Sequence, residues 1–205
     1  MIHIYKEGQK GHPVFVLLHG TGGDETHLLS VGDYLDTQAT ILAVRGNVSE
    51  TGMLRFFKRK EEGVYDLGDL EQKGKELYHF IESSSYEYGF NLEDVILVGF
   101  SNGSNIAINI LLQEESQVNK GILFAPMYPV DLSDNHKDLS DGLVYISAGR
   151  QDPIVPIEAS HEVIDLFQAR QAEVTSYWVN SHELTLDTLN QAKNWLKSIN
   201  SSKPQ

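Results

Sequence analysis

Hydrophobic residues in this chain gather into short continuous runs separated by longer amphipathic stretches. The runs are rich in Val, Ile, Leu, Phe or Tyr and span residues 14–18, 40–44, 95–100, 121–125, 143–148 and 174–179. Each has the length of a strand, and continuous rather than alternating hydrophobicity is typical of strands that are covered on both faces. The pattern therefore predicts a mostly parallel sheet in the core of the protein.

The stretches between these runs have helical spacing. Leu67, Leu70, Gly74, Leu77 and Ile81 follow one another at intervals of three or four residues, which keeps them on one face of a helix. Similar stripes predict helices over about residues 103–112, 157–170 and 189–199. The alternation of strands and helices predicts a doubly wound α/β fold. We expect a single domain over residues 1–200, followed by a frayed tail at 201–205.

Two segments do not fit this alternation. Residues 45–63 form an unusually long connection for a compact domain, and connections of that length often carry function. Residues 127–141 are polar and are expected to form a solvated loop.

Composition and charge exclude several classes of protein. The 205 residues include no cysteine, which excludes a disulfide scaffold, a thiolate zinc site and a cysteine nucleophile. The net charge of −13 disfavours nucleic acid and anionic membrane surfaces as partners. The first residues resemble no signal peptide, and the longest apolar run, 14–18, is far too short to cross a membrane. We therefore expect a cytoplasmic protein.

The most informative local pattern is Gly99-Phe100-Ser101-Asn102-Gly103, a G-x-S-x-G motif. It follows one of the predicted strands and opens a predicted helix, which is the context of a nucleophile elbow. A tight turn of this kind needs small neighbours, and the two flanking glycines supply the space. Ser101 is thus the candidate nucleophile.

A glycine-rich segment follows the first predicted strand and offers hydrogen-bond donors for a developing oxyanion. Its sequence is His19-Gly20-Thr21-Gly22-Gly23-Asp24. Acyl transfer at an elbow serine uses one backbone N–H from such a loop and one from the residue after the nucleophile. We assign these donors to the N–H groups of Thr21 and Asn102. His19 stands directly at the end of the strand, where we expect it to brace the loop rather than to transfer protons.

The remaining catalytic groups are expected at the ends of later strands. Where this elbow occurs, an acid and then a histidine follow the serine along the chain. Asp152 comes just after the predicted strand 143–148, in a turn stiffened by prolines, and His182 comes just after 174–179. His182 is expected to accept the proton of Ser101, and Asp152 to orient the imidazole. This chemistry requires no metal or other cofactor.

Taken together, these ordered motifs resemble the carboxylesterase/phospholipase family of α/β-hydrolases, which includes acyl-protein thioesterase-like enzymes. The resemblance extends over about residues 11–200. Residues 45–66 strengthen the similarity to bacterial carboxylesterases associated with quinone and hydroquinone stress. The family resemblance implies an α/β-hydrolase fold without a separate cap domain, hydrolysis of short to medium acyl or aryl esters, and a small-molecule ester as the partner. Members are often dimeric, so a homodimer is also expected.

The long connection 45–63 supplies the candidate substrate pocket. Its apolar side chains are expected to form a wall over the site: Met53, Leu54, Phe56 and Phe57. It also contains a basic group in this acidic chain: Arg55, Lys58, Arg59 and Lys60. Two interpretations of that group stay open, namely solvated surface charges or attraction of an anionic or phenolic substrate.

Other functions compete with the esterase hypothesis. A lysophospholipase or acyl thioesterase would need a longer apolar groove. An iron-dependent ring-cleaving dioxygenase would have to recruit His19, Glu25 and His27 as ligands, which their placement disfavours. A non-catalytic small-molecule binder on the same scaffold is the third alternative.

Overall fold

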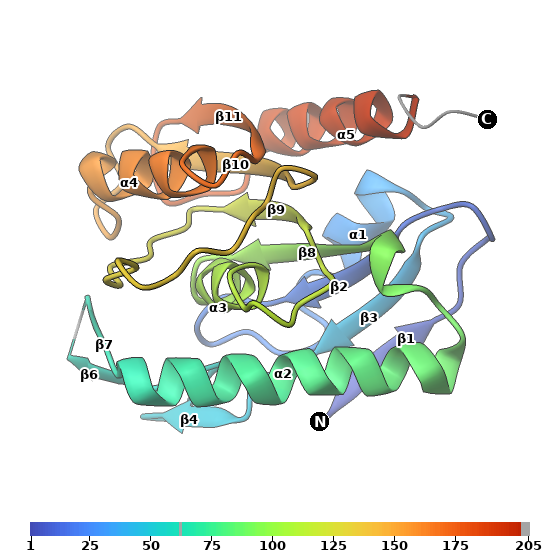
Figure 1. The fold of residues 1–205 in the computed structure, drawn as a ribbon, viewed down its shortest axis with the longest axis horizontal. Coiled ribbons are helices and arrows are strands. Elements are labelled where there is room, and N and C mark those ends of the chain that lie inside the picture. Colours follow the sequence, from blue (N-terminus) through green and yellow to red (C-terminus); the bar gives the residue numbers. More distant parts are fainter. Residues whose placement is uncertain (62, 202–205) are drawn as a thin grey trace.

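The computed structural model describes residues 1–61 and 63–201, which fold around a seven-stranded sheet of order β1-β3-β2-β8-β9-β10-β11 (Figure 1). β1 is antiparallel to β3, and every other neighbouring pair in this sheet is parallel. The strands are β1 (His3–Lys6), β2 (Val14–Leu18), β3 (Thr40–Val44), β8 (Val95–Phe100), β9 (Lys120–Phe124), β10 (Leu143–Gly149) and β11 (Glu173–Val179).

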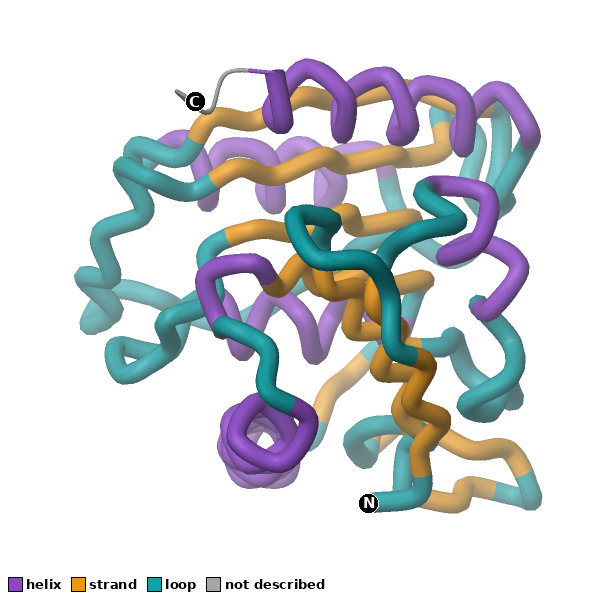
Figure 2. Tube along the Cα trace, turned by 90° about the vertical axis from the view of Figure 1, so that its right-hand side faces the viewer, coloured by secondary structure: helices purple, strands orange, loops and turns teal. Residues whose placement is uncertain are grey.

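Helices cover both faces of the sheet, as Figure 2 shows. One face packs against α1 (Leu29–Leu35) and α5 (Leu186–Ser201), and the other against α2 (Leu67–Tyr88), α3 (Asn102–Leu111) and α4 (Ile157–Gln168). A short 3₁₀ turn, η1 (Leu92–Asp94), leads into β8. The predicted doubly wound, mostly parallel α/β fold is confirmed.

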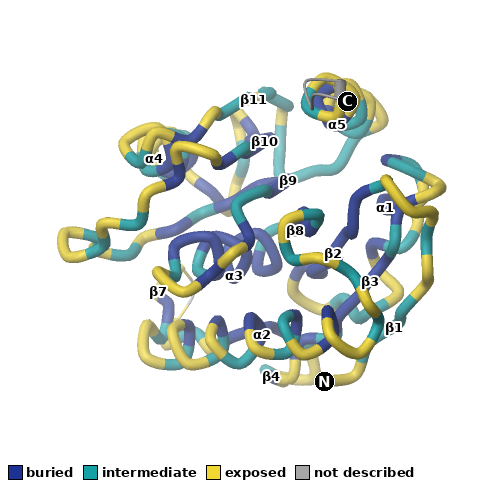
Figure 3. Tube along the Cα trace, turned by 45° about the vertical axis from the view of Figure 1, so that its right-hand side comes forward, coloured by how far each residue is buried: buried dark blue, intermediate teal, exposed yellow. Residues whose placement is uncertain are grey.

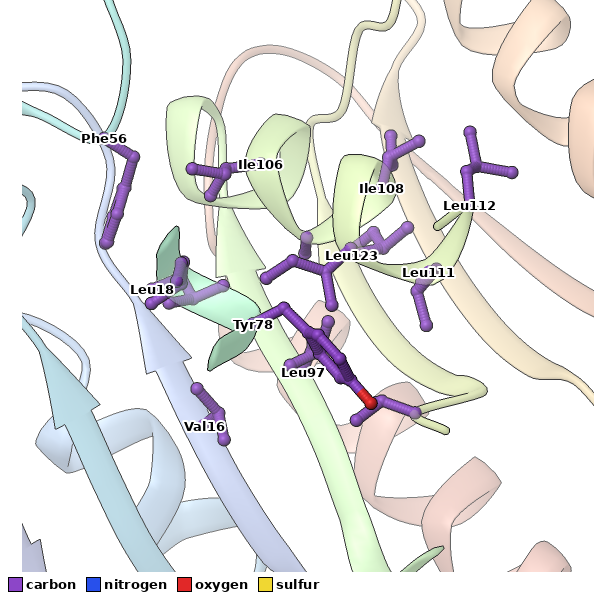
Figure 4. Close-up of a cluster of buried hydrophobic side chains, with 14 of the residues drawn as sticks. Val16, Leu18, Phe56, Tyr78, Leu97, Ile106, Ile108, Leu111, Leu112 and Leu123 are labelled. Atoms are coloured by element: carbon purple, nitrogen blue, oxygen red, sulfur yellow. The ribbon is translucent and has the colours of Figure 1, made fainter. Parts of the chain in front are cut away.

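The core lies in two layers because successive side chains of a strand point to opposite faces. In β2, Val16 and Leu18 pack toward α2 and α3, whereas Phe15 and Leu17 pack toward α1 and α5. Figure 4 shows the first layer, in which β2, β8 and β9 meet side chains of α3. Full burial of each such leucine or valine stabilises the fold by about 1.5–3 kcal/mol.

α2 follows from its sequence pattern. The side chain of Asp66 caps its first turn by accepting a hydrogen bond from the N–H of Asp69, and Gly89 ends it in the left-handed conformation. The predicted stripe is buried from Leu70 to Ile81, while the outer face is exposed to solvent (Figure 3). Leu67, at the start of that stripe, is instead exposed.

The long connection does not form an open loop. It folds into two small antiparallel ribbons, β4 (Val48–Glu50) with β5 (Met53–Arg55), and β6 (Arg59–Glu61) with β7 (Val64–Tyr65). The β4–β5 turn places both Thr51 and Gly52 at positive φ, as a two-residue hairpin turn of type I′ requires. By contrast, residues 127–141 are all described and contain neither helix nor strand, as expected.

Of the predicted tail, Ser201 is the last residue of α5, and residues 202–205 lie outside the described part of the chain. Within residues 1–61 and 63–201, no helix has the length and apolar character needed to span a bilayer.

Candidate active site

The candidate catalytic residues lie at one edge of the sheet because their strands are parallel. β2, β8, β10 and β11 all end at this edge, and their carboxyl ends lead into the glycine loop, Ser101, Asp152 and His182 respectively. In open α/β sheets, ligands bind at this edge. Motifs that are far apart in the sequence are thereby brought close together in space.

Ser101 is held in a strained turn between β8 and α3. Its φ of 52° and ψ of −115° lie in a region that side-chain-bearing residues rarely occupy. A Cβ on Gly103 would lie 1.9 Å from the carbonyl oxygen of Leu18, and one on Gly99 would lie 2.5 Å from the amide of Ser104. Both positions therefore require glycine, because the start of α3 packs against backbone on either side.

The carboxylate of Asp152 contacts the imidazole of His182. Nδ1 of His182 lies 2.7 Å from Oδ2 of Asp152, whose side chain is fully buried, while that of His182 is 12% exposed. The other carboxylate oxygen accepts hydrogen bonds from the N–H groups of Ile154, at 2.7 Å, and Val155, at 2.9 Å. A carboxylate fixed in this way favours the tautomer with a proton on Nδ1, which makes Nε2 a proton acceptor.

The glycine loop presents its backbone to the same site. The N–H of Gly22 donates to the carbonyl of Leu54 at 2.9 Å, and that of Gly23 donates to Gly20 at 3.1 Å. Within residues 1–61 and 63–201, the N–H groups of Thr21 and Asn102 donate to no protein acceptor. Both residues line the cavity that contains Ser101, so both amides can serve an oxyanion there.

The cavity beside Ser101 has a volume of about 540 Å³, which lies in the range of small-molecule sites. Its lining combines apolar side chains with polar and cationic groups. The lining residues are Thr21, Met53, Arg55, Arg59, Gly63, Tyr65, Phe100, Ser101, Asn102, Asn105, Met127, Pro153, Ile154, Val155 and His182. The elbow serine and the histidine thus face a common space.

Comparison with known proteins identifies the family. Residues 60–200 match the model of the Phospholipase/Carboxylesterase family. The chain belongs to this family. Like the proteins it resembles, this carboxylesterase-type protein is a hydrolase.

Its similarity to individual relatives extends over nearly the whole chain. MhqD of Bacillus subtilis (strain 168), which is named as a hydrolase, is 41% identical over 96% of this chain and 98% of its own. The crystal structure of the Bacillus cereus carboxylesterase superimposes with a TM-score of 0.93 at 38% identity, covering 97% of this chain and 94% of the other. The structure titled "Structure of YahD with Malic acid" gives 0.92 at 28% identity, covering 96% and 98%.

The structure separates the four apolar residues expected to form the pocket wall of this carboxylesterase family member. Met53 lines the cavity, but Leu54, Phe56 and Phe57 do not. Phe56 belongs to the same buried cluster as Leu18 and Ile106 (Figure 4), and Phe57 packs edge-on against Tyr65. The chain enters the core directly after β5, so both phenylalanines pack in the core and do not face the cavity.

The side chain of Asn102 has a role that the motif did not indicate. Its Oδ1 accepts a hydrogen bond from the N–H of Phe56 at 2.8 Å, which ties the long connection to the start of α3. Asn105, one helical turn after Ser101, also lines the cavity and donates to the hydroxyl of Tyr65 at 2.6 Å. Helical spacing from the nucleophile was the signal that could have identified Asn105.

His19 braces the loop through both ring nitrogens. Nδ1 lies 2.7 Å from the carbonyl of Gly20, and Nε2 accepts from the N–H of Gly46 at 2.9 Å. Burial lowers the pKa of His19, so the neutral imidazole required by these bonds is favoured. Glu25, one of the three ligands that a dioxygenase would need, is instead paired with Arg45.

Proposed function

We propose that the protein hydrolyses carboxylic esters of small acyl or aryl groups through a Ser101–His182–Asp152 triad. The observation that carries this proposal is the 2.7 Å contact between Asp152 and His182, because His182 lines the same cavity as the elbow serine. Membership of the carboxylesterase family supports the same reaction class.

The first half of the proposed reaction forms an acyl-enzyme. Nε2 of His182 accepts the hydroxyl proton as Oγ of Ser101 attacks the ester carbonyl. The negative charge that develops on the carbonyl oxygen is stabilised by the N–H groups of Thr21 and Asn102. The C–O bond to the alcohol then breaks, and His182 returns the proton to the departing alkoxide.

The second half regenerates the enzyme. A water molecule gives a proton to His182 and attacks the acyl carbon, and the carboxylic acid leaves as Oγ of Ser101 takes the proton back. Asp152 stays ionised throughout and stabilises the transient imidazolium. The two backbone amides that bond its Oδ1 keep Oδ2 directed at His182.

Hydrolysis of a p-nitrophenyl ester series from acetate to laurate, by the wild type and by Ser101→Ala, tests this proposal. A cavity of about 540 Å³ favours the shorter esters. A maximum at the long-chain end would favour a lysophospholipase or acyl thioesterase. Wild-type turnover no higher than that of Ser101→Ala on every ester would contradict the mechanism and favour a non-catalytic binder.

A further inference from the structure

The cavity beside Ser101 is cationic although the chain is strongly acidic. Arg55 and Arg59 both line it, and among the described residues no Asp or Glu does. The chain as a whole has a net charge of −13. A positive wall at this cavity opposes the negative field that the net charge of the chain produces over the rest of the surface.

Arg55 is the more buried of the two arginines, with a side chain only 6% exposed. Its NH1 group donates to Oγ1 of Thr21 at 2.9 Å, and its Nε donates to the carbonyl of Phe57 at 3.3 Å. These bonds hold the guanidinium beside the loop that carries the proposed oxyanion donor. Burial, followed by the charge of Arg59, lowers the pKa of Arg55.

A single carboxylate is shared between the two arginines. Glu50 accepts hydrogen bonds from Nε of Arg59 at 2.9 and 3.1 Å, and its Oε2 lies 3.4 Å from Nε of Arg55. Two guanidinium groups thus face one carboxylate, which leaves an excess positive charge at the cavity wall. A partly buried excess charge is costly unless an anion compensates it.

The two lysines of the long connection do not contribute to this wall. Lys58 is exposed and lies 3.8 Å from Asp69, and Lys60 is exposed. The apolar groups of Met53 and Ile154 complete the cavity. The site therefore combines room for a short carbon chain with guanidinium N–H groups, whose forked geometry matches a carboxylate.

We propose that Arg55 and Arg59 form an anion subsite, so that the preferred substrates are small esters that carry a carboxylate group. This inference rests on the proposed esterase function and names its substrate class. The subsite acts by binding the carboxylate of the substrate, while the ester group lies at Ser101. A compensated carboxylate in such a site is worth about tenfold to a hundredfold in kcat/KM.

The test uses pairs of esters that differ only in charge. Monoethyl succinate and ethyl succinamate place the charge in the acyl group, whereas O-acetylglycolate and O-acetylglycolamide place it in the alcohol. Each is assayed in a pH-stat, and the charged-to-neutral ratio of kcat/KM is compared within each pair. We expect a ratio of ten or more in at least one pair, and a ratio near one in both overturns the proposal.

Single substitutions test whether the two arginines cause the preference for charged esters. Arg59→Gln leaves Arg55 balanced by Glu50 and should reduce the ratio about tenfold, whereas Arg59→Lys should retain part of it. Glu50→Gln should raise the ratio because it removes the competing carboxylate. Lys60→Gln makes the same charge change outside the cavity and should leave the ratio unchanged. Equal losses on charged and neutral esters in Arg59→Gln would show a merely structural role and overturn the proposal.

A binding measurement separates this inference from the esterase proposal. Calorimetric titration with succinate reports on the anion subsite whether or not any ester is hydrolysed. We expect binding by the wild type that Arg59→Gln weakens about tenfold, and no detectable wild-type binding overturns the subsite. Hydrolysis of the neutral esters that depends on Ser101 would then leave the esterase function standing.

Discussion

Replacing Ser101 with glycine should stabilise the protein while abolishing its activity. A side-chain-bearing residue at φ 52° and ψ −115° costs about 1–3 kcal/mol, and glycine removes that strain. The larger backbone entropy of glycine in the unfolded state offsets about 0.5–1 kcal/mol of the gain. The net effect is about 1 kcal/mol, which corresponds to a rise in Tm of about 2–4 °C for a domain of this size.

The comparison that isolates backbone strain is Ser101→Gly against Ser101→Ala. Both variants lack the hydroxyl, but only alanine keeps the Cβ that makes this conformation unfavourable. Ser30, exposed on α1, supplies the matched control, since glycine there should be less stable than alanine by about 1 kcal/mol. Thermal unfolding of the four variants measures both differences. If Ser101→Gly melts at or below Ser101→Ala, the elbow is not strained and the reasoning is refuted.

Three further predictions concern the groups around the nucleophile. Asp152→Asn should lower kcat by about 10³–10⁴. The backbone amides that hold Oδ1 would direct the new NH₂ group at Nδ1 of His182, which disfavours the tautomer with a proton on Nδ1. An unchanged kcat would contradict the role assigned to Asp152. Gly103→Ala should cost about 1–3 kcal/mol in urea unfolding, since its Cβ would meet the carbonyl of Leu18. The free energy of unfolding should fall as the pH drops below about 6.5, the ordinary pKa of histidine, because His19 then binds a proton in the unfolded chain more readily than in the folded protein, where its pKa is lowered. His19→Gln should make this pH dependence less steep, and an equally steep profile in the variant would refute the prediction.

Much of the fold could be predicted from the sequence because its signals are local. Runs such as 14–18 and 95–100 coincide with β2 and β8, since strands buried on both faces must be continuously hydrophobic. The order of Asp152 and His182 after Ser101 predicted the pair, and the parallel arrangement brings the ends of the two strands to one edge. β1 was not predicted, because this edge strand is only partly buried and lacks a continuous apolar run.

The pocket was harder to predict because its wall depends on tertiary contacts. Within the sequence Met53-Leu54-Arg55-Phe56-Phe57, nothing indicates that the arginine faces the site while the phenylalanines enter the core. That orientation follows from hydrogen bonds to residues far along the chain, including Phe56 to Asn102 and Arg55 to Thr21. Residue type alone suggested apolar groups at the pocket, and it left open whether the basic residues lie in water or attract an anionic substrate.

Labelling with a fluorophosphonate tests most directly whether Ser101 is a nucleophile activated by His182. Mass spectrometry of the digested protein locates the adduct, because the probe reacts covalently with activated serines. We predict one adduct per chain on the peptide that contains Ser101, absent in Ser101→Ala and formed far more slowly in His182→Gln. An adduct on another serine, or equal labelling of wild type and Ser101→Ala, would contradict the account.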